Sequence, residues 1–440
     1  MPPTILLATL GSLGDLYPVL SLARALRDRG AVARLALAPD DCAVAADWGL
    51  PATPVGPSRA EMSRRLGMSG DDIARSVLRD PGPLLNGVLL PMLADLARET
   101  ESLARGADAV AATTFALHAA LAAERRGLPL FPLLLQPMVM FSALDPPRAS
   151  AFRLAVPQPG PAGRLWNRGL IALAHGVLRA RHRRALTRIR AGLGLPPQPG
   201  TPLVDHGAAV PARLGLWDPR FAPVPADAPS RTVATGFPPS PPGALPPEVA
   251  AWLDAGPAPL VVTLGSIAHA LAGPRFWDEA AALARRMGRR AVLLHGEAAA
   301  PRGDGLLALR YAPHAPLFPR AHAVLHHGGI GTTSEAIRAA RPQLVLPVGG
   351  DQPDNAARLA GLGLAATLPA RRFTARRAER VLAPLLARFD TDRADAFAAT
   401  VRGRDGAAAA AALILDRIGA RRVGSKPAAG RSGTERTGHP

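Results

Sequence analysis

The segment AVLHHGGIGTTSEAIRAA, residues 323–340, passes from an apolar run through a glycine-rich turn into a stretch of helical periodicity. The same succession of apolar run, glycine turn and longer Ala/Leu/Arg segment recurs along the chain, as is typical of parallel α/β sheets. Strands are predicted in two groups, at 4–10, 33–38, 108–114 and 128–135, and then at 258–266, 290–296, 307–312, 322–329 and 342–350. The pattern predicts an α/β protein of two domains.

Composition divides the chain between these two groups of strands. Prolines and alanines dominate residues 223–259, which indicates a semi-rigid interdomain connection. We therefore expect an N-terminal domain at 1–222 and a C-terminal domain at 260–400. A C-terminal helix that packs back on the N-terminal domain is expected at 401–419, and a polar, disordered tail at 420–440.

Length and charge restrict the class of protein. The 440 residues suffice for two or three domains, and the hydrophobic fraction of 48% indicates a globular chain. The formal net charge is +18, but it comes from scattered arginines, Lys426 being the only lysine. This distribution argues against a nucleic-acid partner, while the net charge suits anionic ligands or an anionic membrane surface.

Cys42 is the single cysteine, so no intramolecular disulfide can form and a reducing compartment, the cytoplasm, is expected. We interpret Cys42 as a small buried apolar residue rather than a nucleophile. The opening MPPTILLATLGSLGD lacks the basic region of a signal peptide. Apolar runs are shorter than the ~20 residues that span a bilayer.

The segment at 165–195 has a helical pattern unusually rich in arginine. One interpretation is a solvated helical face. The other is an amphipathic helix that makes peripheral contact with an anionic inner membrane surface.

The glycine-rich turn has the features of an anion site. Glycines at 328, 329 and 331 allow close approach to the backbone, and the following helix N-terminus favours a diphosphate. The turn matches neither the dinucleotide fingerprint nor a P-loop. His326 and His327 are adjacent in a strand and point to opposite faces, so a shared metal ion is disfavoured. A histidine is better suited to offer a hydrogen bond, or a positive charge, to a phosphate oxygen.

Polar residues follow in two places. Thr332 and Glu335 fit a capping box, and the alternative is that Glu335 accepts hydrogen bonds from a ribose diol. Asp351 and Gln352 come directly after a predicted strand and two glycines, where open α/β sheets bind ligands. An ordinary polar loop would have the same composition.

The spacing of these residues resembles a known motif. Glu335 follows His327 by eight positions and Asp351 follows it by 24, with Gln352 next. This arrangement resembles the donor-binding motif of glycosyltransferase family 1, nucleotide-sugar-dependent enzymes of the GT-B fold. The resemblance implies two Rossmann-like domains whose parallel sheets face each other across a cleft.

Other segments extend the resemblance to roughly residues 4–418. RYAPHAPLFPRA is similar to the family's Trp-x-Pro-Gln segment, with Tyr311 in place of tryptophan and His314 in place of glutamine. The opening ATLGSLGDLYPVLSLARALRDRG is similar to the bacterial branch with glycopeptide, sterol and rhamnolipid glycosyltransferases. Within that branch, TGFP, RYAP, GGIG and DQPDNAARLAGLG look nearest to the rhamnosyltransferases that build rhamnolipids.

The resemblance also implies roles for individual residues. The base of the donor, uridine or thymidine, would stack on Tyr311, with Ala312 or His314 at its polar edge. Glu335 would bind the ribose, and Asp351 and Gln352 the hydroxyls of the sugar. The residues that would hold the diphosphate are Ser266, His327, Gly329, Gly331 and Thr332.

Asp15 is the predicted catalytic base, at a position where many relatives carry histidine and this branch carries aspartate. Its alternative role is to cap the helix that follows. The leaving diphosphate would be stabilised by the helix N-terminus near Thr332 and by His327. We therefore expect a metal-independent enzyme without a cofactor besides its nucleotide-sugar co-substrate. Inversion at C1 is implied by the family.

The aliphatic stretches at 82–96 and 135–147 suit a lipid-like or natural-product acceptor, such as that of a glycolipid or secondary-metabolite enzyme, although a core or lid would have the same character. Two other classes stay open. One is a non-catalytic nucleotide-sugar-binding protein. The other is a dinucleotide-dependent oxidoreductase, which the missing fingerprint disfavours.

Overall fold

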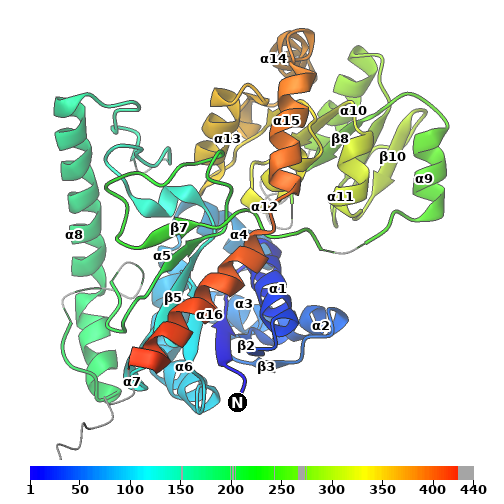
Figure 1. The fold of residues 1–440 in the computed structure, drawn as a ribbon. Helices are drawn as coiled ribbons and strands as arrows, with labels where there is room; N and C mark the ends of the chain where they lie inside the picture. The colour runs from blue at the N-terminus through cyan, green and yellow to red at the C-terminus, as the bar shows by residue number, and fades with distance from the viewer. Residues whose placement is uncertain are drawn as a thin grey trace, which may run out of the picture.

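The computed structural model describes residues 1–149, 152–198, 200, 203, 205–241, 243–265, 273 and 275–424. These residues form two parallel sheets, one of seven strands in the order β3-β2-β1-β4-β5-β6-β7 and one of six in the order β10-β9-β8-β11-β12-β13 (Figure 1). Each sheet is covered by helices, as parallel sheets require. The predicted α/β architecture of two domains is confirmed.

The N-terminal sheet carries its helices in chain order. Its strands are β1 (Thr4–Ala8), β2 (Val32–Leu37), β3 (Ala52–Pro54), β4 (Ala109–Thr113), β5 (Leu130–Leu134), β6 (Arg213–Gly215) and β7 (Thr232–Ala234). Its helices are α1 (Leu13–Asp28), α2 (Pro39–Asp47), α3 (Arg59–Leu66), α4 (Gly70–Arg79), α5 (Gly82–Leu84), the π-helix η1 (Leu85–Leu89), α6 (Leu90–Leu103), α7 (Leu117–Arg125), the 3-10 helix η2 (Pro137–Met140) and α8 (Pro161–Gly192).

The C-terminal sheet follows the same plan. Its strands are β8 (Leu260–Thr263), β9 (Ala291–Leu294), β10 (Leu306–Leu309), β11 (Ala323–His326), β12 (Gln343–Val345) and β13 (Ala365–Thr367). Its helices are α9 (Pro247–Asp254), α10 (Phe276–Arg286), α11 (His314–Leu317), η5 (Phe318–Arg320), α12 (Ile330–Arg338), α13 (Gln352–Gly361), η6 (Ala370–Arg372), α14 (Ala375–Ala387) and α15 (Thr391–Arg402).

The side chains of the central strand β1 alternate between two buried clusters, one on each face of the sheet. Ile5 and Leu7 of β1 pack on the side of α1, whereas Leu6 and Ala8 pack on the side of α7. All five residues of β1 are buried, which explains why the strand reads as a continuous apolar run. The carboxyl end of β1 therefore delivers the following turn, with Asp15, to one edge of the sheet.

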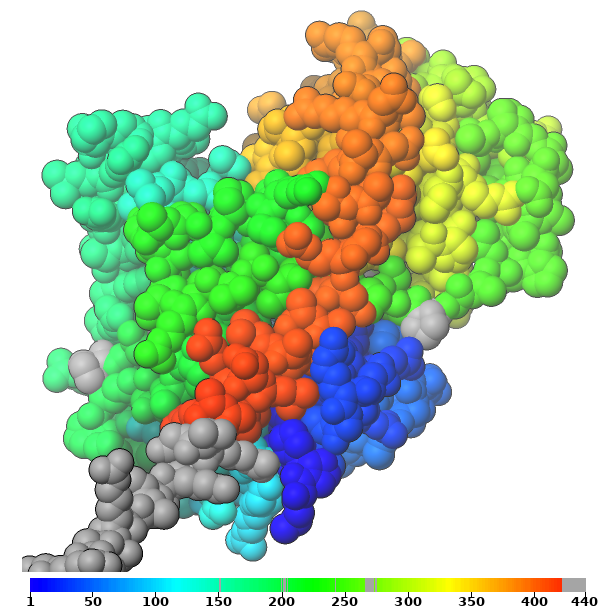
Figure 2. All heavy atoms as spheres, in the orientation of Figure 1, coloured from blue at the N-terminus to red at the C-terminus, as the bar shows by residue number. Residues whose placement is uncertain are grey.

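The last helix, α16 (Gly406–Gly424), returns to the N-terminal sheet. Ala410, Ala411 and Ile414 belong to the same buried cluster as Leu16 and Leu20 of α1. In Figures 1 and 2, α16 continues from α15 and lies across the N-terminal domain beside α1. The chain therefore joins its two domains twice, once before α9 and once after α15.

Three predicted boundaries need correction. The connection predicted at 223–259 contains β7 and α9, and β7 extends the N-terminal sheet by pairing with β6. Three-residue strands are too short for a periodic sequence signal and depend on their neighbours for stability. The helix predicted at 401–419 begins at Gly406 and continues to Gly424, into the stretch predicted as a tail.

Candidate functional site

The glycine-rich turn opens directly into α12. Gly329 is the N-cap, and Gly328 has a positive φ of 93°, where an added Cβ would lie 2.8 Å from Val345 Cγ1. The N–H groups of Ile330, Gly331 and Thr332 thus belong to the first helical turn and have no intrahelical acceptor. Apart from its two chain neighbours and the adjacent backbone of α12, no heavy atom of the described residues lies within 4 Å of a Cβ placed on Gly331. The first turn of α12 is therefore open to a ligand.

The capping-box interpretation of Thr332 and Glu335 is wrong, because the helix starts earlier and Thr332 lies inside it. Glu335 is 8% exposed and its Oε1 accepts a hydrogen bond of 2.6 Å from Nη1 of Arg338. Nη2 of Arg338 donates to the carbonyl oxygens of Phe237 and Pro238. Glu335 thus helps to anchor the interdomain connection to α12.

His326 is a fully buried part of the framework. Its Nδ1 accepts a hydrogen bond of 3.2 Å from the Gly328 N–H, so its Nε2 carries the proton that is donated to Oε1 of Gln343 at 3.0 Å. Burial lowers the pKa of His326 to about 4. The neutral ring therefore holds the turn in place through its hydrogen bond with the Gly328 N–H.

His327 lies on the side of the turn that His326 does not reach. A Cβ on Gly265 would lie 2.5 Å from its Cε1, and one on Gly329 would lie 2.4 Å from its Nε2. Its Nδ1 is buried and has no hydrogen-bond partner among the described residues. Burial, with contributions from His326 and His314, lowers the pKa of His327 to about 3. The ring is therefore neutral and offers a hydrogen bond rather than a charge.

Ser266, which the sequence places next to Gly265, lies outside the described residues.

Asp351 is connected to the glycine turn through Asn355. Nδ2 of Asn355 donates to Oδ2 of Asp351 at 2.7 Å and to the carbonyl oxygen of Gly328 at 2.9 Å. Burial raises the pKa of Asp351 to about 7. Oε1 of Gln352 accepts hydrogen bonds from the N–H groups of Val348 and Gly349, so this side chain supports its own loop.

In the segment that follows β10, the aromatic ring of Tyr311 is exposed. Tyr311 is 64% exposed, whereas Ala312 is 1% exposed. The ring of His314 stacks on Phe318 at 4.5 Å, and burial lowers the pKa of His314 to about 4. A ligand can therefore reach the ring of Tyr311 but not the methyl group of Ala312.

Asp15 occupies the first turn of α1 and completes a capping box. Its Oδ2 accepts hydrogen bonds from the N–H of Ser12 at 2.8 Å and from the Ser12 hydroxyl at 3.0 Å. Burial raises the pKa of Asp15 above its ordinary value, and the bonds from Ser12 oppose this shift. Asp15 thus has the helix-capping role that was its alternative interpretation, and burial makes its carboxylate more basic.

The two domains meet at the loop that carries Asp351. The Gly350 N–H donates to the carbonyl oxygen of Leu78, at the end of α4, at 3.0 Å. Nη1 of Arg358 on α13 lies 2.8 Å from Oδ2 of Asp145, which belongs to the N-terminal domain. Through these contacts Asp15 comes close enough to contribute to the raised pKa of Asp351.

The two aliphatic stretches that the sequence suggested for the acceptor, 82–96 and 135–147, lie in different surroundings. Leu85, Val88, Leu89 and Leu93 are buried in a cluster that also contains Leu186 of α8, so the stretch at 82–96 supplies core rather than an open pocket. The stretch at 135–147 contains η2 and leads to the domain contact at Asp145.

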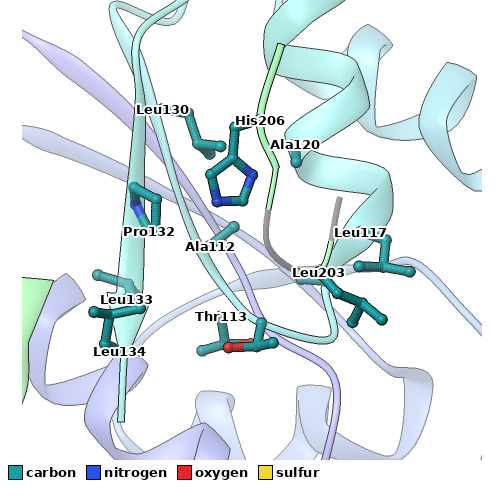
Figure 3. Close-up of a pocket in the computed structure, with 12 residues that line it drawn as sticks. Ala112, Thr113, Leu117, Ala120, Leu130, Pro132, Leu133, Leu134, Leu203 and His206 are labelled. Atoms are coloured by element: carbon teal, nitrogen blue, oxygen red, sulfur yellow. The ribbon is translucent and has the colours of Figure 1, made fainter. Parts of the chain in front are cut away.

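A small cavity of about 30 Å³ lies between β4, β5 and α7 (Figure 3). The ring of His206 points into it among Leu130, Pro132 and Ala120, and burial, with Arg213, lowers the pKa of His206 to about 4. This volume holds one or two water molecules and is too small for an acceptor.

Within the described residues, no group of three or more His, Cys, Asp or Glu side chains is arranged to hold a metal ion.

Several residues of this site had no assigned role in the sequence. Asn355 follows Asp351 by one helical turn, and this spacing is a usable signal for a contact between them. Gln343 is a buried polar residue in a predicted strand, which also indicates a required partner. The contributions of Leu78 and Arg338 depend on the domain arrangement and have no local signal.

Comparisons with known proteins show which families and chains this sequence resembles. The family described as erythromycin biosynthesis protein CIII-like, C-terminal domain, matches residues 296–411. The vancomycin aglycone glucosyltransferase of Amycolatopsis orientalis is 35% identical over 437 residues, covering 94% of this chain and 97% of that protein. Glycosyltransferase GtfE of the same organism is 33% identical, covering 94% of this chain and 98% of its own.

Solved structures share the fold at lower identity. The glycotransferase of kitacinnamycin superposes with a TM-score of 0.66 at 20% identity, covering 95% of this chain and 100% of that one. The glycosyltransferase VinC, solved in complex with dTDP, superposes with a TM-score of 0.61 at 22% identity, covering 95% and 100%. These likenesses establish the GT-B fold.

Proposed function

The chain belongs to the bacterial branch of glycosyltransferase family 1, and from this premise we propose that it moves a hexose or deoxyhexose from a dTDP- or UDP-sugar to a hydroxyl of an apolar acceptor. Its relatives are named as glycosyltransferases, and they support a nucleotide-sugar-dependent glycosyltransferase. The observation that carries the finer proposal is the open first turn of α12. His327 contacts the N-cap Gly329, Asn355 links Asp351 to Gly328, and Asp15 approaches Asp351 from the other domain.

The donor would bind along the carboxyl edge of the C-terminal sheet. The N–H groups of Ile330, Gly331 and Thr332 would hold the diphosphate, helped by the helix dipole and by a hydrogen bond from His327. Tyr311 would stack on the base, since its ring is the exposed aromatic face of that segment. Glu335 would reach the ribose, and Asp351 with Gln352 the sugar. VinC, a structural neighbour, was solved with dTDP, which favours thymidine over uridine.

Transfer would proceed by direct displacement. The acceptor oxygen attacks C1 of the sugar, the bond from C1 to the diphosphate oxygen breaks, and the configuration inverts. Asp15 would take the acceptor proton, because its raised pKa makes it a better base than an exposed aspartate. Since Oδ2 accepts both bonds from Ser12, Oδ1 is the oxygen that would receive the proton.

The departing diphosphate would be stabilised without a divalent ion. The helix N-terminus and the N–H groups of the first turn would face the position where its charge develops. Because His327 is neutral, it would contribute a hydrogen bond and not a second positive charge.

The acceptor would be an apolar natural product or a lipid-like molecule. Relatives named for their acceptors include the vancomycin aglycone glucosyltransferase and an O-mycaminosyltylonolide 6-deoxyallosyltransferase, 37% identical over 187 residues. Aliphatic residues in the N-terminal domain near Asp145 suit such an acceptor. A rhamnosyl donor remains one of the deoxyhexose options.

A thermal-shift screen with dTDP, UDP and GDP and their sugars tests the donor, because a ligand that binds only the native state raises the melting temperature. We expect dTDP or UDP to stabilise the protein and GDP not to. Release of dTDP or UDP in the presence of an apolar acceptor then tests transfer. Binding without turnover for any acceptor would instead support a non-catalytic nucleotide-sugar-binding protein.

A further inference from the structure

The outer surface of α8 is apolar where a helix exposed to water is normally polar. Ten large hydrophobic side chains are exposed in the described part of the chain, and six of them lie between residues 154 and 177. They are Leu154, Val156, Leu165, Trp166, Leu173 and Val177, and the exposed fraction ranges from 39% for Val156 to 72% for Leu165. Apolar patches of this kind mark interaction sites.

These side chains form one continuous stripe. Leu165, Trp166, Leu173 and Val177 are spaced so that they share one face of the helix. Small exposed residues at 162, 169, 172, 176 and 180 fill the same face. We call this stripe, together with Leu154 and Val156, the outer face of α8.

The start of the outer face is held in place by hydrogen bonds. Nε1 of Trp166 donates to the carbonyl oxygen of Leu154 at 2.9 Å. The buried side chain of Asn167 pairs with both backbone groups of Val156, at 2.9 and 3.1 Å. The exposed hydrophobic residues thus belong to an ordered surface.

The opposite side of α8 is packed against the N-terminal domain. His182, Leu186 and Arg190 are buried there, and both terminal nitrogens of Arg190 pair with Glu124 at 2.9 and 2.6 Å. In Figure 1, α8 forms the left edge of the molecule with no labelled element outside it, and Figure 2 shows the same segment at the margin of the surface. The outer face is therefore accessible to a large partner.

The positive charge of α8 favours an anionic partner for the outer face. The helix contains eight arginines and no acidic residue. Arg179 and Arg190 pair with acidic residues of the body, and the other six are exposed, at positions 164, 168, 181, 183, 184 and 188. Two copies of this face would bring like charges together, which disfavours a dimer. An anionic lipid surface neutralises the arginines and accepts the apolar stripe and Trp166.

We propose that α8 docks the enzyme on an anionic bilayer, with its axis in the plane of the interface. Leu165, Trp166, Leu173 and Val177 enter the boundary between headgroups and acyl chains, while the arginine side chains extend to the lipid phosphates. Among the helices of the described residues, none has the length and apolar character needed to cross a bilayer, so the contact is peripheral.

Vesicle sedimentation with the full chain tests this proposal. Vesicles of phosphatidylcholine mixed equally with phosphatidylglycerol should bind the protein, and pure phosphatidylcholine should bind it far less. Raising the salt from about 0.1 M to about 1 M should weaken binding, because the Debye length falls from about 10 Å to about 3 Å. Absence of binding to the anionic vesicles at low salt would overturn the proposal.

Two pairs of variants separate the apolar and the basic contributions. Leu173→Gln/Val177→Gln should reduce the partition coefficient about tenfold or more. Arg183→Gln/Arg184→Gln should reduce it about fivefold per arginine. The matched controls are Val32→Gln, an exposed valine of the N-terminal sheet, and Arg371→Gln/Arg376→Gln, exposed arginines of the C-terminal domain. Equal losses in the controls would contradict a specific docking face.

Trp166 provides a readout in the otherwise unaltered protein. Its fluorescence should shift to the blue and be quenched by brominated lipids, and Trp166→Phe should remove this change. If Leu173→Gln/Val177→Gln does not fold, the fluorescence of Trp166 decides the matter by itself. A concentration-dependent dimer without vesicle binding would overturn the proposal in favour of a second copy. Sugar transfer to a water-soluble acceptor should be unchanged in all these variants. A failure of the membrane-docking proposal would therefore leave the proposed function unaffected.

Discussion

Asp15 and Asp351 belong to opposite domains, yet they lie close enough for the charge of Asp15 to contribute to the raised pKa of Asp351. Asp15 is in the first turn of α1, and Asp351 is the N-cap of α13. Their proximity depends on domain contacts such as the hydrogen bond from Gly350 to Leu78. A candidate base for the acceptor and a candidate ligand for the sugar are thus supplied by different domains.

Asp15→Asn should lower turnover by about 10²- to 10⁴-fold, because the acceptor proton loses its base. Affinity for dTDP should change little, since the amide can still accept the bonds from Ser12. Initial rates of nucleotide release and thermal shifts with dTDP measure the two quantities. The exposed Asp28→Asn, at the other end of α1, serves as the control. Unchanged turnover in Asp15→Asn would remove Asp15 from the catalytic role.

His327→Gln should weaken dTDP binding by roughly tenfold or more, the loss expected for one hydrogen bond to a charged group. Binding of thymidine, which has no phosphate, should be unaffected. Calorimetric titration with both ligands checks the difference, and His322→Gln, directly before β11, is the control. Equal weakening of both ligands would indicate a general disturbance of the C-terminal domain.

Asn355→Ala should weaken the binding of a dTDP-sugar more than that of dTDP. The amide of Asn355 holds Asp351, which is proposed to bind the sugar, and also the carbonyl oxygen of Gly328. A destabilisation of about 1–3 kcal/mol is expected as well, because buried acceptors lose their donor. Titrations with the two ligands give the ratio, and an unchanged ratio would argue against coupling through Asn355.

Asp351 should make stability depend on pH in a defined window. Its folded pKa of about 7 exceeds the ordinary value of 3.8, so its contribution is complete below the ordinary value and is lost as the pH rises through about 7. Asp351→Asn removes this loss. The free energy of unfolding of the variant, measured by urea denaturation, should therefore gain on that of the wild type as the pH rises from about 4 to about 7. Parallel curves would contradict the raised pKa.

Transfer should persist in EDTA, because the first turn of α12 and His327 are proposed to stabilise the diphosphate without a divalent ion. Initial rates before and after chelation, followed by addition of magnesium, measure this. Complete loss in EDTA with recovery in magnesium would show that a metal ion is required.

Much of the site is accessible from local sequence. The strand, the glycine turn and the helix around His327 are encoded by neighbouring residues, and the spacing to Glu335 and to Asp351 resembles that of the family motif. The helix boundary was the local error, because a backbone turn at Gly329 begins α12 before the first side chain that could cap it.

Other features required the assembled fold. The three-residue strands β6 and β7 exist through pairing with their neighbours, and α16 is buried only because it returns to α1. The apolar stripe of α8 could not be separated from core in the sequence, since Leu173 and Leu186 on the same helix are equally apolar. Packing buries Leu186 and leaves Leu173 exposed.

The sequence by itself determined the alternation of strand and helix, the glycine-rich turn before α12 and the family, because these depend on short-range patterns and fixed spacings. The tertiary structure alone decided the protonation of His326, His327 and Asp351 and the approach of Asp15 to Asp351. Desolvation and long-range charge depend on which segments become neighbours in space, and no local pattern specifies that.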